Sequence, residues 1–466
     1  MNRQQMLGEE KVTKLLVQFS IPAIIGMMVN VLYNIVDRMF IGNIPKVGGL
    51  ALTGVGITLP IMTIILAFGM LVGLGASARI SLKLGEHKRD EAEKHLGNAF
   101  TLILLISALI TIIGLIFMSP ILKIFGASPE TEGYAVQYMQ IIFIGTVFNM
   151  LSFGLNHSIR SDGNPKLAMF SMLIGAGTNI ILDPIFIFGF GMGVRGAALA
   201  TIISQIASTI WIMYYFTKGK STIKICRNSM KLEWPIVMSI FSIGMSPFAM
   251  QIAQSIVLVL ANNALKEYGG DLAIGAMTIV NSISMIFMMP LFGLNQGSQP
   301  IIGYNYGAKK YGRVKDAVKI PVIIATIIVT VGWILVQFAP KMLIQIFSND
   351  QNLLEMAVTG TKIFLFMFPV LGFQTISSNY FQSIGQAKIS MVLSLLRQVI
   401  LLIPCLIILP HINGLGLTGV WLSGPVADGL ASIITGLVFF TSIRKLKDNS
   451  DPSYSRDRMP SVSEGM

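Results

Sequence analysis

Apolar runs of about 20 residues recur along almost the whole chain, from Lys14 to Arg444. The hydrocarbon core of a bilayer is ~30 Å thick, and a helix needs ~20 apolar residues to cross it. Inside lipid the backbone amides must hydrogen-bond to one another, which leaves only helices or closed barrels. Barrel strands alternate apolar and polar residues, and these runs do not alternate. The chain is therefore predicted to be an all-α membrane protein with the lipid bilayer as its main partner.

Twelve of these runs are separated by short polar loops, and each is expected to be one transmembrane helix. The predicted spans are residues 14–42, 50–78, 96–118, 133–158, 167–190, 196–216, 235–263, 272–304, 317–339, 355–381, 387–410 and 415–443. Only 12% of the 466 residues are charged, about half the share that is usual in soluble domains. The first run is too long for the apolar region of a cleavable signal, so we expect it to remain as an anchor.

The basic residues are distributed very unevenly between alternate loops. Of the 34 Lys and Arg residues, 26 fall in one set of loops together with the two chain ends, and 5 fall in the opposite loops. Loops rich in Lys and Arg stay in the cytoplasm. We therefore expect a multi-pass protein of the cell (inner) membrane with both termini cytoplasmic. The net charge of +12 comes from these scattered loops and not from one basic face, so nucleic acid is not an expected partner.

The two halves of the chain match at a constant offset of 222 residues. For example, Ser20 corresponds to Ser242, and Gly85 corresponds to Gly307. Each half has six predicted spans, so both halves enter the membrane from the same side. Parallel repeats of this kind place a substrate site between them. We predict pseudo-symmetric six-helix lobes at 1–216 and 235–443, a cytoplasmic linker at 217–234, and a disordered cytoplasmic tail at 444–466.

Polar residues gather on three helix faces at one depth of the N-terminal lobe. At 1.5 Å per residue, Asp37 lies ~33 Å along its span from Leu15, and Asp183 lies ~24 Å along its span from Leu167. Both carboxylates therefore belong to the outer half of the membrane, and we predict one shared pocket there. Within each span these polar residues recur at helical spacing and so share one face of the helix. The faces are Asn30, Tyr33, Asn34 and Asp37 in the first span, Asn179 and Asp183 in the fifth span, and Thr201, Ser204 and Gln205 in the sixth span.

An ionisable side chain at membrane depth is a functional candidate by default. Burial and a neighbouring carboxylate both favour the protonated form of a carboxylic acid, so Asp37 and Asp183 could exchange a proton near neutral pH. Carboxylate, amide and hydroxyl oxygens are also the ligands that a hard cation such as Na⁺ takes. A cation that moves inward gains ~2.3 kcal/mol per 100 mV. Such a pocket could couple that energy to export.

Structural roles for these ionisable residues stay open at this point. Asp37 could pair with Arg38 at the outer interface, and Asp183 could bond to backbone groups that Pro184 leaves free. His157 lies near the cytoplasmic end of its span, and we expect it to be solvated or to cap the helix.

The C-terminal lobe lacks both carboxylates. At the common offset Val259 stands opposite Asp37, and Cys405 stands opposite Asp183, so the fold itself does not require them. Neutral polar groups of this lobe could line the cleft between the lobes or hydrogen-bond neighbouring helices, and Asp428 is expected to serve helix packing. The expected substrate-binding residues of the two lobes are Asn30, Tyr33, Asn34, Gln251, Asn281, Gln296 and Arg397.

Motifs for nucleotide, zinc or thiol chemistry are missing from the sequence. A G-x-G-x-x-G pattern at Gly191, Gly193 and Gly196 lies between two membrane helices and follows no strand, so it is not a nucleotide site. There is no G-x-x-x-x-G-K-[ST], H-E-x-x-H or C-x-x-C sequence. We therefore do not expect an enzyme, and we expect no cofactor apart from H⁺ or Na⁺ as a coupling ion.

Several segments resemble one transporter family. Residues 179–189 (NIILDPIFIFG) and 193–201 (GVRGAALAT) closely resemble the span five–six signature of the multidrug and toxic compound extrusion (MATE) family. Residues 293–308 (GLNQGSQPIIGYNYGA) resemble its second-half signature, and residues 395–398 (LLRQ) and 419–421 (GVW) are similar too. The resemblance covers about residues 10–445.

The resemblance implies two lobes in a V shape that open alternately to either side. It also implies export of small organic cations in exchange for H⁺ or Na⁺, by a protein without an obligatory protein partner that we expect to be a monomer. Asp37 matches the first-span aspartate of the prokaryotic branch of the DNA-damage-inducible-F type. That branch is thought to couple cations through residues that match Asp37, Asp183, Asn179, Thr201 and Asn156. If the ion is Na⁺, the first four would be its ligands.

A lipid-linked precursor flippase of the same superfamily is the alternative. Such proteins face a phosphate-bearing head group and need an arginine-rich lumen. In this sequence only Arg397 lies deep within a span, so the cation antiporter is the favoured prediction.

Overall fold

The computed structural model describes residues 3–45, 47–347 and 351–446, and this part of the chain is helical and holds no strand. The predicted all-α fold is thereby confirmed, while most of the predicted tail lies outside the described residues. The α-helices are α1 (Arg3–Glu9), α2 (Val12–Gly42), α3 (Gly48–Ile57), α4 (Leu59–Gly85), α5 (Arg89–Ile116), α6 (Met118–Ile124), α7 (Glu132–Ser161), α8 (Pro165–Pro184), α9 (Val194–Thr217), α10 (Trp234–Gly307), α11 (Tyr311–Phe338), α12 (Pro340–Gln345), α13 (Gln351–Phe364), α14 (Phe368–Ser383), α15 (Ala387–Leu395), α16 (Ile403–Ile408) and α17 (Gly416–Lys445). Two π-helical segments, Ile185–Gly189 and Leu396–Leu402, and two 3₁₀ turns, Arg227–Met230 and Leu409–Gly414, join some of them.

Among the described residues, eleven helical stretches are long and apolar enough to cross a membrane, and there are twelve if the bent pair α13 and α14 is one span. This number agrees with the twelve predicted spans. The long helix α10 contributes two of them, because it is interrupted at Gly270, where φ is +65°. Glycine adopts positive φ readily, whereas residues with a Cβ do so at a steric cost.

The predicted second span, residues 50–78, is wrong at both ends. Residues Gly48–Ile57 form the separate short helix α3, and the spanning helix α4 runs from Leu59 to Gly85. The Thr58 hydroxyl donates a hydrogen bond of 2.7 Å to the Val55 carbonyl, which closes α3. Pro60 then fits the first turn of α4, where its missing N–H costs nothing. The apolar run continues through this break, so hydropathy alone placed the boundary incorrectly.

The predicted tenth span, residues 355–381, is not one straight helix. Helices α13 and α14 meet at an angle of 51°. Pro369 lies in the first turn of α14 and lacks the N–H that a continuous helix would need at that position. The chain therefore starts a new helix in a new direction.

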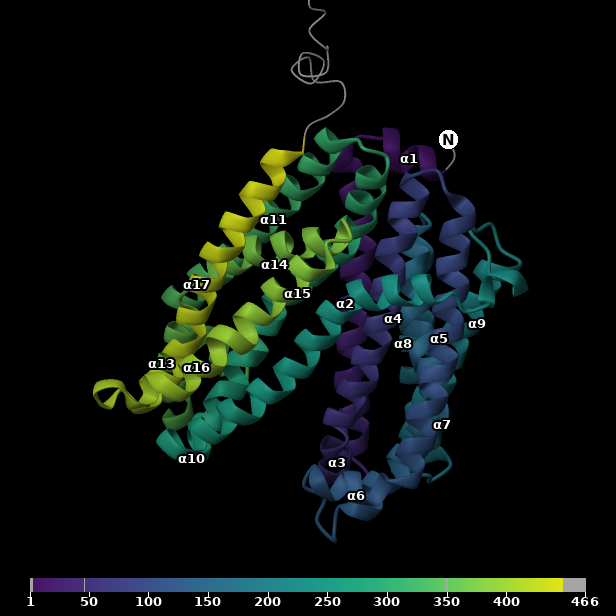
Figure 1. Cartoon of the computed structure of the whole chain (residues 1–466). Coiled ribbons are helices and arrows are strands. Elements are labelled where there is room, and N and C mark those ends of the chain that lie inside the picture. Colours follow the sequence, from purple (N-terminus) through teal and green to yellow (C-terminus); the bar gives the residue numbers. More distant parts are fainter. Residues whose placement is uncertain (1–2, 46, 348–350, 447–466) are drawn as a thin grey trace, which may run out of the picture.

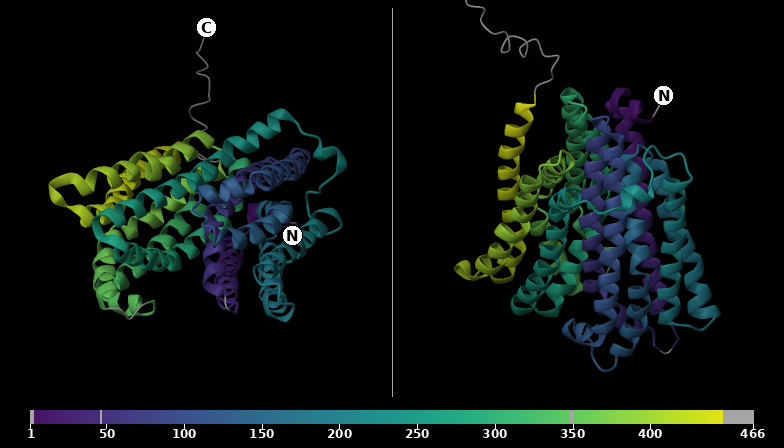
Figure 2. Two further views of the ribbon diagram at one scale, coloured as in Figure 1. Left: turned by 90° about the horizontal axis from the view of Figure 1, so that it is seen from below. Right: turned by 45° about the vertical axis from the view of Figure 1, so that its right-hand side comes forward.

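The helices form two bundles that lie together at one end and diverge towards the other (Figure 1). One bundle contains α2–α9 and the other contains α10–α17, and Figure 2 shows the same division from below and in a view turned by 45°. The joined end also holds α1 and the last turn of α17. We call it the inner end, because the basic loops predict that it faces the cytoplasm, and we call the opposite end the outer end.

Glycines bring the two bundles into backbone contact towards the inner end. A Cβ added at Gly75 would lie 2.2 Å from the carbonyl oxygen of Ile240, and one at Gly85 would lie 2.0 Å from that of Tyr304. A Cβ at Gly244 would lie 1.7 Å from the carbonyl oxygen of Leu71. These contacts of α4 with α10, which we call the inner seam, leave no room for a side chain between the backbones. The two bundles are therefore closed against each other on this side.

Candidate cation-binding site

The first polar face lies on the outer half of α2, as its helical spacing predicts. Asp37 is only 8% exposed. The Asn34 amide donates hydrogen bonds to the backbone carbonyl of Asn30 at 2.7 Å and to the Asn30 side-chain oxygen at 3.3 Å. Arg38 is exposed, and the structure shows no hydrogen bond or ion pair between it and Asp37 within the described residues. The charge of Arg38 still acts on Asp37, so Arg38 is an electrostatic neighbour of Asp37 and not a hydrogen-bonded partner.

The second and third faces meet where α8 packs against α9. Asn179 and Asp183 are both fully buried. The Asn179 amide donates to Asp183 Oδ1 at 3.1 Å and to the Thr201 hydroxyl at 3.5 Å. Proline at position 184 ends the regular helix, and the next residues continue as a π-helical turn. Asp183 is thus held by Asn179 one turn earlier and not by backbone groups that the proline leaves free.

The two carboxylates come together across α2 and α8. Asp37 and Asp183 lie within hydrogen-bonding reach of each other and interact directly. The structure therefore brings the two carboxylates of the predicted site together in one buried polar cluster. Two phenols complete its wall, because Tyr33 of α2 and Tyr138 of α7 both interact with the carboxyl groups, and Tyr138 also reaches the Thr201 hydroxyl.

Tyr138 is the residue of this pocket that sequence reasoning did not identify. It is buried, and its neighbours one turn away on α7, Ala135 and Ile142, are apolar, so it forms no polar face with a helical spacing. A buried tyrosine is also common in ordinary helix packing. No pattern in the sequence distinguishes it, and only the approach of α7 to α9 brings it to the site.

Three buried oxygens of the site have no hydrogen-bond partner among the described residues: Asp37 Oδ1, Asn179 Oδ1 and Asp183 Oδ2. More than nine in ten buried polar groups in proteins are hydrogen-bonded, so each exception calls for an explanation. All three of these atoms are acceptors. The group that would satisfy them must bring positive charge or a hydrogen, which a proton or a small cation does. With only two carboxylates present, a metal ion here would also need the neutral oxygens of Asn179 and Thr201.

The remaining predicted residues are not part of this cluster. Asn156 donates to the Ala168 carbonyl at 2.8 Å and to the Ser171 hydroxyl at 2.5 Å. Ser171 precedes Asn179 by eight residues on α8, so Asn156 lies ~12 Å nearer the inner end. The two neutral residues Gln251 and Asn281 lie on α10, partly and largely exposed respectively. Gln296 donates to the Met27 sulfur at 3.5 Å, which places it between the two bundles.

Arg397 is engaged within the C-terminal bundle. Its Nε donates to Asp428 Oδ1, and the two side chains form an ion pair. Asp428 is 5% exposed, so the pair neutralises a carboxylate that would otherwise be buried alone. The role of Arg397 in substrate binding stays a prediction, and the structure shows that its side chain has a local partner. The π-helical segment Leu396–Leu402 places it towards α17.

His157 was expected to be solvated or to cap a helix, and that expectation is wrong. Its side chain is buried, 4% exposed, between helices of the N-terminal bundle. Four residues of α7 follow it before the helix ends at Ser161. The packing of α4 and α8 over this last turn covers it.

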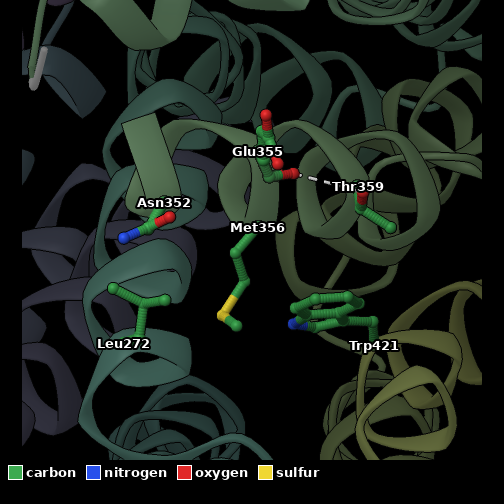
Figure 3. Close-up of a pocket in the computed structure, with 6 residues that line it drawn as sticks. All are labelled: Leu272, Asn352, Glu355, Met356, Thr359 and Trp421. Carbon is green, nitrogen blue, oxygen red and sulfur yellow. Dashed lines mark hydrogen bonds between the residues drawn. The ribbon is translucent and has the colours of Figure 1, made fainter. Parts of the chain in front are cut away.

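A separate pocket of about 540 Å³ opens at the outer tip of the C-terminal bundle (Figure 3). Its wall is formed by α10 just after the break at Gly270, by α13 and by the beginning of α17, and none of its lining residues is a predicted site residue. The lining residues are Leu272, Asn352, Glu355, Met356, Thr359 and Trp421. The carboxylate pair belongs to the other bundle, so this pocket is a different feature from the cation site.

Comparison with known proteins agrees with this architecture. The MatE family model matches residues 22–185 and 247–407. The chain is 31% identical over 445 residues to the multidrug export protein MepA of Staphylococcus aureus (strain MSSA476), with 94% of this chain and 96% of that protein covered. It is 37% identical to the solved MATE multidrug transporter DinF-BH, with a TM-score of 0.86 over 94% of this chain and 98% of that one. A MATE protein solved in the bent conformation gives a TM-score of 0.90 at 25% identity over 96% and 98% of the two chains.

A chain of about twelve membrane-crossing helices, in two bundles with a buried polar site inside one of them, is a multi-pass membrane transporter. The family model covers well over half of the residues. The chain belongs to the MATE family, and it is a protein of the cell membrane. Its place in the DNA-damage-inducible-F branch stays a prediction.

Proposed function

We propose that the chain is a multidrug efflux antiporter that exports small cationic amphipathic compounds in exchange for H⁺ or Na⁺. The names of its relatives support export of several compounds, since the MepA proteins are multidrug export proteins and DinF-BH is a multidrug transporter. The ion-coupled part rests on the site in the N-terminal bundle. Asp37 is the main coupling residue, Asp183 is its partner, and Asn179 and Thr201 complete the site.

The observation that carries the proposal is the set of three buried oxygens on Asp37, Asn179 and Asp183 that find no partner within the described part of the chain. Two carboxylates that approach each other away from water repel strongly when both are charged. Binding one H⁺ or Na⁺ removes this repulsion and joins α2 to α8. Losing the ion reverses the change. Of the helices that hold the site, α2 also packs against α10 towards the inner end, where Gly297 approaches the backbone of Ser20, so the state of the site can bias which side is open.

The flippase alternative receives less support. A lumen that accepts a phosphate-bearing head group needs free basic side chains. Arg397, the single arginine deep within a predicted span, is paired with Asp428. Asp37 and Asp183 add negative charge on the other side, which favours a cationic substrate.

Transport by purified protein in lipid vesicles tests the proposal. A pH gradient and a Na⁺ gradient are imposed separately, and movement of the fluorescent organic cation ethidium is followed for the wild type and for Asp37→Asn and Asp183→Asn. We expect gradient-driven transport by the wild type and at least a tenfold loss in both variants, because an amide neither releases a proton nor supplies a charged ligand. Comparing the two gradients identifies the ion.

Asp90→Asn is the matched control, because it makes the same chemical change at an exposed carboxylate near the inner end of α5. It should transport ethidium like the wild type. Wild-type transport by both Asp37→Asn and Asp183→Asn would refute the coupling role. Movement of an anionic lipid without any transport of ethidium would favour the flippase.

A further inference from the structure

A buried arginine lies at the inner end of the N-terminal bundle and forms no ion pair with a described acidic residue. Arg160 is 2% exposed and is the largest fully buried side chain of the protein as described. Its Nη1 lies 3.4 Å from His157 Nδ1, and its Nη2 lies 3.6 Å from the Met172 sulfur. Its Nε has no hydrogen-bond partner among the described residues. An uncompensated guanidinium is costly to bury, so its presence calls for a functional reason.

Arg160 of α7 lies in the same bundle as the carboxylate site, nearer the inner end. Met172, which contacts its guanidinium, lies on α8, eleven residues before Asp183 and therefore ~17 Å from it along the helix. The Met172 sulfur would lie 2.6 Å from a Cβ at Gly26 of α2. The guanidinium thus lies where α7, α8 and α2 converge, nearer the inner end than Asp183 and Asp37.

A file of buried polar side chains connects the two. From Thr201 it passes along α9 to Ser204, whose hydroxyl donates to the Thr201 carbonyl at 2.7 Å. Ser208, one turn further, donates to the Ser171 carbonyl of α8 at 2.8 Å. The Ser171 hydroxyl in turn accepts from the Asn156 amide at 2.5 Å. Asn156 precedes Arg160 by one turn of α7, so the file leads towards the guanidinium.

The internal repeat supplies a natural comparison. At the offset of 222 residues, Gln382 stands opposite Arg160, and it too is buried. The C-terminal lobe therefore uses a neutral amide at this place. That lobe also has Val259 and Cys405 where the N-terminal lobe has Asp37 and Asp183. The positive charge accompanies the carboxylates and is not a requirement of the repeated fold.

We propose that Arg160 is a fixed positive charge that closes the inner end of the N-terminal lobe to the coupling cation. This inference rests on the proposed coupling function of Asp37 and Asp183. The polar file would otherwise let an ion that reached the carboxylates from outside continue to the cytoplasm without any exported compound. A cation that approaches a buried guanidinium is strongly repelled, which slows its passage by about a hundred- to a thousandfold. Arg160 is thus a positioning residue for tight exchange and does not touch the substrate.

A purely structural role is the competing explanation. Arg160 lies in the last turn of α7, where a cation interacts favourably with the helix dipole. That role would affect stability alone. If the role were structural, replacing Arg160 would not cause an ion leak that depends on Asp37.

Passive ion flux in vesicles without any drug separates the two explanations. Vesicles with wild type, Arg160→Gln, Arg160→Lys and the double variant Arg160→Gln/Asp37→Asn are given a H⁺ or Na⁺ gradient, and its decay is followed. We expect at least a tenfold faster decay with Arg160→Gln, near wild-type decay with Arg160→Lys, and loss of the extra flux in the double variant. Arg160→Gln introduces the residue of the matched lobe, and Arg160→Met serves if that variant does not fold.

The inference is overturned if folded Arg160→Gln and Arg160→Met hold the gradient as well as the wild type. It is also overturned if Arg160→Lys leaks as fast as Arg160→Gln, or if the leak persists without Asp37. Failure of the coupling proposal looks different, because the wild type itself would then show no gradient-driven transport of ethidium.

Discussion

The inner seam makes a quantitative prediction about the balance between outward-facing and inward-facing states. In Gly244→Ala, the new Cβ would lie 1.7 Å from the Leu71 carbonyl oxygen and 2.6 Å from its carbon. Ordinary contacts of a Cβ begin at 3.4 Å, so α10 and α4 must separate by about 1.7 Å at this point. Because both obstructing atoms belong to the backbone, no rotation of a side chain relieves the clash.

The energetic consequence follows from typical costs of overpacking, which are about 1–3 kcal/mol. This cost falls on the state in which the seam is closed and not on the state in which the bundles separate there. The ratio of inward-facing to outward-facing molecules should therefore rise by about 5- to 150-fold. Transport should slow, because each cycle requires the protein to close the seam again.

Chemical labelling measures this shift. Ser81 is buried next to Gly303 in the same contact of α4 with α10, so a cysteine placed there becomes accessible only when the inner end opens. With Cys226 and Cys405 replaced by serine, an impermeant maleimide added at the inner side should label Ser81→Cys faster in the Gly244→Ala background.

Gly177→Ala is the matched control, since a Cβ at Gly177 of α8 meets nothing within 4 Å. Its labelling rate at Ser81→Cys should equal that of the parent. Unchanged labelling in the Gly244→Ala background would refute the view that the seam is closed by backbone contact and opens during transport.

Three further predictions concern other parts of the molecule. Arg397→Gln should lower the thermal unfolding midpoint in detergent, because breaking a buried ion pair typically costs about 3–5 kcal/mol. Adding Asp428→Asn should recover part of the loss, and an unchanged midpoint in the single variant would contradict the pairing. Arg313→Ala should speed proteolytic cleavage of the segment that precedes α2, since the Nη2 of Arg313 donates to the carbonyls of Leu7 at 3.2 Å and Glu10 at 2.6 Å. Equal cleavage rates in the variant and the wild type would show that these hydrogen bonds do not hold α1 in place. Glu355→Gln should leave ethidium transport unchanged, because the pocket at the outer tip is separate from the carboxylate pair, and a loss above about threefold would assign that pocket to the transport path.

Much of the architecture could be predicted from the sequence, because lipid restricts what an apolar chain can do. Runs of about 20 apolar residues must become helices, so the all-α fold and the approximate number of spans follow from local composition. Helical periodicity also places Asn179 one turn from Asp183, and the rise per residue places both, like Asp37, in the outer half of the membrane. Boundaries inside a continuous apolar run were not predictable in this way, as Thr58 and Pro60 illustrate.

Which helix faces which was decided only by the tertiary structure. Periodicity assigns a side chain to a face, but it does not name the neighbour across that face, because packing depends on the shapes of all surrounding side chains. The contact of Asp37 with Asp183, 146 residues later in the chain, the arrival of Tyr138 at the site and the pairing of Arg397 with Asp428 are of this kind. The burial of a side chain also depends on the tertiary packing. His157 and Arg160 lie near the end of a span, where the sequence suggests water, and the packing of neighbouring helices removes them from it.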